Sequence, residues 1–188
     1  MLNVNGLNYL PNNRNQEDID NVNWDLMEIS KIDDKIIKRL LDKINSGISD
    51  DFYISLESLI QIGEKAKPAL ISFIKNNKIN SNTKIILYFI IDYIENKGTD
   101  YPLVFKLYNP DFVVRARTIM ELEDSDYSDY LEYILPLIED PDDSVRWAII
   151  KYLSSNNLID NPLVRGKLNS HITNELNPVI KSKIKDIL

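Results

Sequence analysis

The sequence predicts an all-α fold in which pairs of helices stack into an α-solenoid. From Lys31 onward apolar residues recur at spacings of three and four, as at Ile32, Ile36 and Leu40, which is the period of a helix with one buried face. The sequence lacks sustained period-two alternation, which is the pattern of a half-buried strand. A short motif returns after 31 residues, and a period of this length is typical of stacked helix pairs.

Residues 1–30 form a separate N-terminal arm in this interpretation. Eight of the first 23 residues are asparagine, and the apolar residues among them follow no period. We expect residues 1–15 to be mobile or loosely docked. A short capping helix is expected over about 16–30, held by Trp24, Leu26, Met27 and Ile29. The repeat domain then fills residues 31–188.

The first two helix pairs are predicted from their apolar spacing. The first pair takes residues 32–45 and 51–59, where isoleucine and leucine repeat on one face. The second pair takes 66–77 and 83–91, and its run from Ile85 to Ile91 is the longest apolar stretch of the chain. Seven residues cannot cross a bilayer, which needs roughly 20. We therefore expect no membrane contact and a cytoplasmic protein.

The third and fourth pairs carry the repeated motif. After first helices over 100–108 and 127–139 come Asn109-Pro110-Asp111-Phe112-Val113-Val114-Arg115 and Asp140-Pro141-Asp142-Asp143-Ser144-Val145-Arg146. Asp111 and Asp142 are placed to cap the second helices over 114–122 and 145–153. We assign Asp111, Arg115, Asp142 and Arg146 to an Asp–Arg ladder between adjacent units. A fifth pair, 163–173 and 179–187, repeats the frame in weaker form.

The motif, together with Leu59-Ile60-Gln61-Ile62-Gly63 and Pro68-Ala69-Leu70, resembles short HEAT-like repeats of the phycobilisome-lyase type. This resemblance covers residues 32–188 and implies about five HEAT-like helix pairs in an armadillo-type fold. It also implies that the second helix of each pair lines a concave surface. The family usually has alanines midway along that helix, whereas this chain has four alanines in total. We therefore expect irregular spacing or curvature between the repeats.

Apolar and aromatic residues are expected on the concave face. The third and seventh positions of the second helices should point outward, and an exposed apolar row is typical of an interface. Trp147 is the preferred anchor, because tryptophan dominates many interfaces. The alternative is that irregular packing or the N-terminal arm covers this row. The residues assigned to partner binding are Tyr53, Ile85, Phe89, Arg117, Met120, Trp147 and Lys151.

The charge distribution is uneven. The formal net charge of −7 opposes binding to nucleic acid and to anionic membranes. Between Thr118 and Val145 there are ten acidic residues and no lysine or arginine. This stretch is either a solvated face or a surface that attracts a basic protein partner. The residues assigned to the acidic block are Glu121, Glu123, Asp124, Asp126, Asp129 and Glu132.

Several kinds of chemistry are excluded by composition. The chain has no cysteine and a single histidine, His171, so disulfides, thiol catalysis and zinc sites with several Cys or His ligands are impossible. The calcium-binding loop with its central glycine is missing, as are glycine-rich phosphate loops and activated-serine motifs. We expect neither a metal nor a cofactor, and we interpret His171 as a polar residue at a helix end.

These observations favour a non-enzymatic, cytoplasmic protein–protein interaction module or scaffold. One alternative is an enzyme or small-ligand carrier similar to HEAT-like bilin lyases or alkylpurine DNA glycosylases, with Trp147, Arg117 and Asp124 lining a pocket. Another is an acidic inhibitor or immunity-type protein that masks a basic active site. The sequence leaves these alternatives open.

Overall fold

The computed structural model describes residues 32–96, 102–122 and 130–188. Every regular element in these ranges is a helix, which confirms the prediction of an all-α fold. The arm predicted over 1–30, with its capping helix, lies outside the described residues.

The helices follow the five predicted pairs. The first two pairs are α1 (Asp34–Asn45) with α2 (Asp50–Ile62), and α3 (Lys67–Asn76) with α4 (Ser81–Glu95). The third pair is α5 (Pro102–Leu107) with α6 (Phe112–Glu121). In the fourth pair, α7 (Leu131–Ile134) continues as the 3-10 helix η5 (Leu135–Glu139) and is followed by α8 (Asp143–Ser155). The fifth pair is α9 (Pro162–His171) with α10 (Pro178–Ile187).

A polar side chain caps the start of each second helix. The Asp111 carboxylate accepts a hydrogen bond from the Val113 amide at 2.9 Å, and Asp142 accepts one from Ser144 at 2.8 Å. Such a cap satisfies an amide that has no partner within the helix. The five caps, 31, 31, 31 and 35 residues apart, are Ser49, Asn80, Asp111, Asp142 and Asn177.

In the first and the last pair, the prediction of which residue of the second helix begins the buried face is wrong by one position. In those pairs the buried position that follows the cap by three residues is Phe52 and Ile180, whereas the prediction counted from residues 51 and 179. Val179 is in fact exposed. This shift changes which side chains of α2 and α10 face the core.

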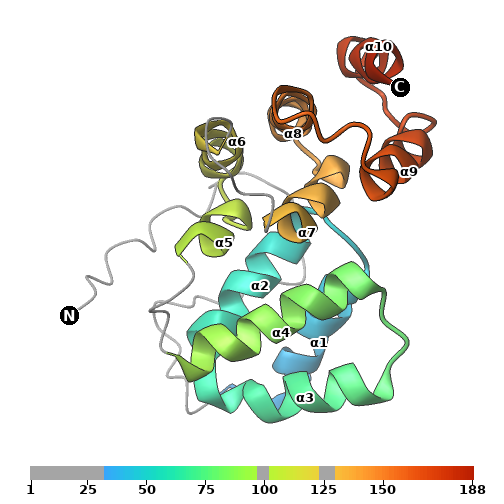
Figure 1. Ribbon diagram of the computed structural model, residues 1–188. Coiled ribbons are helices and arrows are strands. Elements are labelled where there is room, and N and C mark those ends of the chain that lie inside the picture. Colours follow the sequence, from blue (N-terminus) through green and yellow to red (C-terminus); the bar gives the residue numbers. More distant parts are fainter. Residues whose placement is uncertain (1–31, 97–101, 123–129) are drawn as a thin grey trace.

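The third to fifth pairs form a regular two-layer array. The second helices α6, α8 and α10 make one row, and α5, α7 and α9 make the other (Figure 1). Within the first row α6 packs along α8, and α8 packs along α10. The side chains between the rows belong to one continuous apolar core, as expected for repeats that stack to share a core.

The first two pairs leave this register. Helices α1–α4 lie together next to α5 and α7, on the side away from α6 and α8 (Figure 1). Helix α4 packs against α7, and Tyr93 of α4 stacks on Phe105 of α5 with ring centroids 5.5 Å apart. The first-helix side of the array is therefore covered over α5 and α7, while within the described residues the row of α6, α8 and α10 keeps an uncovered face (Figure 1).

Candidate interaction surface

An ion pair buried inside the array joins the third and fourth helix pairs. The Arg115 Nε and Nη2 atoms donate to the two carboxylate oxygens of Asp140 at 2.8 and 2.9 Å, and both side chains are buried. Arg115 Nη1 donates to the carbonyl oxygens of Asn109 and Pro110. A buried ion pair offsets the loss of hydration only with geometry of this quality. This contact therefore holds α6 firmly against the following pair.

The same arrangement returns one repeat later. Arg146 Nε and Nη2 donate to the carboxylate oxygens of Glu175 at 2.8 and 3.0 Å. Glu175 also accepts from the Asn177 amide at 2.7 Å, and its Oε2 lies 2.9 Å from His171 Nε2. Burial disfavours the Glu175 carboxylate, but the hydrogen bonds from Arg146, Asn177 and His171 outweigh burial and lower its pKa to about 2. His171 thus belongs to a structural network.

The carboxylates of the ladder differ from those predicted. Asp111 and Asp142 cap their helices, while the arginines bind the residues two positions before a cap, Asp140 and Glu175. A helical side chain leans toward the N-terminus of its helix, so each guanidinium reaches the loop that leads into the helices and not the caps themselves. The arginine positions were visible in the motif, but their acceptors were not.

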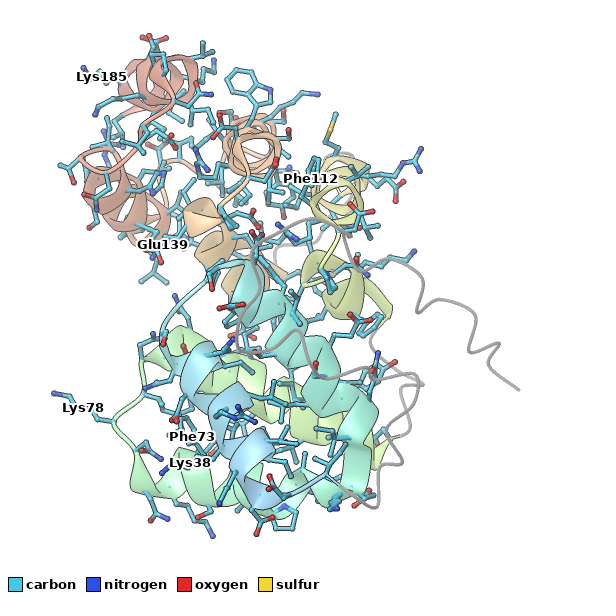
Figure 2. The ribbon with its side chains drawn as sticks, turned by 180° about the vertical axis from the view of Figure 1, so that it is seen from behind. Lys38, Phe73, Lys78, Phe112, Glu139 and Lys185 are labelled. Atoms are coloured by element: carbon cyan, nitrogen blue, oxygen red, sulfur yellow. The ribbon has the colours of Figure 1, made fainter. Side chains whose placement is uncertain are left out.

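The ladder ends at α10. Lys181 takes the position of Arg115 and Arg146, and its ammonium donates to the Glu175 carbonyl oxygen at 3.2 Å. Ile119 of α6 and Ile150 of α8 occupy the same repeat position and are buried. At this position α10 has Lys185, which points away from the row at its outer edge (Figure 2). A polar outer edge is typical of the last repeat of an array.

The prediction that Tyr53 binds a partner on an exposed face is wrong. Tyr53 has an exposed fraction of 0%. Because α2 is capped by Ser49, Tyr53 takes the repeat position of Arg115. Its hydroxyl donates to Asp140, and the Arg115 guanidinium lies 3.8 Å from the ring centroid. Burial and the negative charge of Asp140 raise the pKa of Tyr53 well above its ordinary value.

The same prediction is wrong for Phe89, which is only 4% exposed. Its ring centroid lies 6.5 Å from that of Tyr133, at the contact between α4 and α7. Phe89 is buried because α4 packs onto the first-helix side of the array and does not extend the row of second helices. Ile85, also on α4, is half-buried. The residues of the predicted row that come from the first two helix pairs are therefore buried or half-buried.

The other members of the predicted row are exposed. Met120 of α6 is 51% exposed and Trp147 of α8 is 40% exposed. Lys151 is exposed one turn after Trp147. Arg117 is exposed at the side of α6, and its Nε lies 3.7 Å from Glu121 Oε1. Of the residues assigned to partner binding, only those on α6 and α8 are therefore exposed.

Helix α10 completes this surface with residues that the prediction missed. Val179 is 63% exposed, and the proline after Asn177 signalled a helix start that would have placed it correctly. Trp147 and α10 enclose an open, shallow groove lined by Trp147, Pro178, Val179, Ser182, Lys183 and Asp186. We name the whole surface the second-helix face and define it as Ala116, Met120, Trp147, Lys151, Val179, Ser182, Lys183 and Asp186.

The acidic stretch is only partly a free surface. Glu121 and Glu132 are exposed. Four further acidic residues have partners within the fold as ladder, cap or ion-pair residues, and of these only Asp140 is buried: Glu139, Asp140, Asp142 and Asp143. The remaining members assigned to the block, Glu123, Asp124, Asp126 and Asp129, lie outside the described residues. Asp124 was also the third residue of the pocket predicted from Trp147 and Arg117.

Two other kinds of feature are missing from the described ranges. Among residues 32–96, 102–122 and 130–188, no group of three or more His, Asp or Glu side chains is placed to hold a metal ion. In the same ranges, each helix is too short or too polar to pass through a lipid bilayer.

Comparison with known proteins agrees with this architecture. Residues 102–185 match the model of the HEAT-repeat family, and they hold the third, fourth and fifth helix pairs. The match is to HEAT repeats in general and names no phycobilisome-lyase subtype. No curated protein and no solved structure matches the chain significantly. The match and the stacked helix pairs together support a HEAT-like repeat protein.

Proposed function

We propose that this protein is a non-enzymatic interaction module that binds another protein chain through the second-helix face. The observation that carries the proposal is the exposure of Trp147, with Met120 and Val179 beside it on the neighbouring helices. Large apolar side chains that gather on an exposed surface are typical of binding sites. Tryptophan in particular supplies much of the binding energy of an interface.

The ladder prepares this face for binding. Arg115 joins α6 to the loop before α8, and Arg146 joins α8 to the loop before α10. Trp147 directly follows Arg146 in α8, so its backbone belongs to a helix fixed from both sides. Binding through side chains on a rigid scaffold costs less conformational entropy than ordering a loop.

Charge has a smaller part in the proposal than the apolar residues. Of the acidic block, Glu121 and Glu132 are exposed in the described residues and would attract a basic partner by long-range steering. Such steering changes the association rate and weakens at raised salt. The anchoring contacts remain those of Trp147 and its neighbours.

The proposal is tested by comparing Trp147→Ala with Tyr88→Ala as a matched control. Tyr88 is also an exposed aromatic residue, at 52% against 40% for Trp147, but it lies on α4 outside the second-helix face. Each variant would be used to capture proteins from an extract of expressing cells, with folding checked by circular dichroism. Trp147→Ala should weaken capture by about 2 kcal/mol or more, roughly thirtyfold, and Tyr88→Ala should not.

Two results would contradict this function. One is capture that depends equally on Tyr88 and Trp147, or on neither. The other is a small molecule, bound at full occupancy and seen in native mass spectra, that Trp147→Ala releases. The latter result would favour the ligand-carrier alternative.

A further inference from the structure

We infer that the second-helix face binds a second copy of this chain about a two-fold axis that runs across the helices. The inference rests on the proposed function, because it names the partner of the same surface. Each of the three helices presents two side chains about one turn apart, and on α8 and α10 the two members of the pair can attract each other. This pattern makes the face complementary to itself.

The complementary pairs are formed by exposed side chains together with Lys183, which is half-buried in the groove. On α8, the indole of Trp147 is followed four residues later by the ammonium of Lys151, and both are exposed. On α10, Lys183 is followed three residues later by Asp186, and both line the groove beside Trp147. Residues three and four apart lie on the same side of a helix. The two pairs therefore point toward the same partner.

Helix α6 carries a pair of apolar character. Ala116 is half-buried and Met120 is exposed, four residues apart. A small side chain beside a long flexible one leaves a shallow depression next to a projection. Met120 can fill such a depression, since its unbranched side chain adapts to irregular surfaces.

A two-fold axis in the face and perpendicular to the helices reverses the helix direction in the second copy. It places the second member of each pair opposite the first. Trp147 then meets Lys151 of the partner subunit, which is a cation–π contact. Lys183 meets Asp186 of the partner subunit as an ion pair, and Ala116 meets Met120 of the partner subunit. Symmetry makes each contact twice.

Other arrangements match the face less well. A two-fold axis parallel to the helices would place Lys151 against Lys151 of the partner subunit, and Met120 against Asp186 of the partner subunit. A nucleic acid, or another partner with charges of one sign, would be attracted by one of Lys183 and Asp186 and repelled by the other. Only the perpendicular axis pairs each charge with an opposite charge or an aromatic ring.

The experiment measures the dimerisation constant of the full chain by sedimentation up to about 1 mM, a range that includes weak interfaces. Lys183→Glu and Asp186→Lys each place like charges opposite one another, so each should weaken dimerisation about tenfold or more. An equimolar mixture of the two variants should associate as tightly as the wild type, because two acidic residues then face two lysines. Lys185→Glu is the control, since Lys185 points away from the row (Figure 2) and should leave dimerisation unchanged.

The outcomes separate this inference from the proposed function. A wild-type chain that stays monomeric over the whole range overturns the inference. In that case the proposed function still stands if Trp147→Ala weakens the capture of a different protein. A dimer that the charge variants leave intact, or a mixture that fails to associate, also overturns the inference. A dimer lost in both single variants and regained in their mixture establishes it.

Discussion

Removal of the Asp140 carboxylate should strongly destabilise the protein. In Asp140→Ala the Arg115 guanidinium stays buried without its ion-pair partner and keeps its hydrogen bonds to two carbonyl oxygens and its contact with the Tyr53 ring. Removing one member of a buried ion pair typically costs about 3–5 kcal/mol. The Tyr53 hydroxyl and the Asp142 amide lose their acceptor as well. We therefore expect a loss of at least about 3 kcal/mol, a large part of the 5–15 kcal/mol that usually stabilises a domain.

The measurement is urea unfolding followed by circular dichroism at neutral pH. Glu139→Ala is a control from the adjacent position, because Glu139 is exposed and its ion pair with Lys167 should contribute below about 1 kcal/mol. If Asp140→Ala unfolds at nearly the same urea concentration as Glu139→Ala, the ladder does not stabilise the array. Replacing both partners, as in Arg115→Met with Asp140→Leu, should recover most of the loss, since no buried charge is left unpaired.

Three further predictions concern the same core. Tyr53→Phe keeps the ring on Arg115 but loses a hydrogen bond to the Asp140 carboxylate, so urea unfolding should show a loss of about 1.5 kcal/mol. Ser55→Ala should leave stability unchanged or raise it by up to about 1 kcal/mol, because the buried hydroxyl has no hydrogen-bond partner among the described residues; a clear loss would show a hidden acceptor. Glu175 has a pKa of about 2 in the folded state against 4.5 for the free side chain, so its ionised form adds stability above pH 4.5 that disappears as the pH falls toward 2. Unfolding curves from pH 7 to pH 2 should therefore show a smaller acid-induced loss for Glu175→Gln than for the wild type.

The parts of the fold that local sequence determines were predictable. Helix period and cap residues report on contacts within a few positions, and these gave the five pairs. The motif pointed to Arg115 and Arg146 as residues that join units, because an arginine at the same place after a capping aspartate must have the same surroundings in each repeat. Trp147 directly follows Arg146, and the same repeat spacing predicted that its side chain is exposed, as the structure shows.

The parts that depend on distant contacts were not predictable. Ser49, Asp50 and Asp51 can all cap a helix, and a one-residue error there moves Tyr53 from the buried to the exposed side. Nor does periodicity say what a buried face packs against. Phe89 lies on an apolar helix face in either arrangement, but only the structure shows that α4 packs on α7.

The contact between Tyr53 and Asp140 also bears on how the chain folds. These residues are 87 positions apart, whereas neighbouring units of a regular repeat array join residues about 30 positions apart and fold by local propagation. During synthesis the first helix pair leaves the ribosome long before residue 140 exists, so the Tyr53 hydroxyl has no acceptor until the fourth pair has been made. The contact that joins the first helix pair to the fourth therefore cannot form until the chain has been synthesised beyond residue 140.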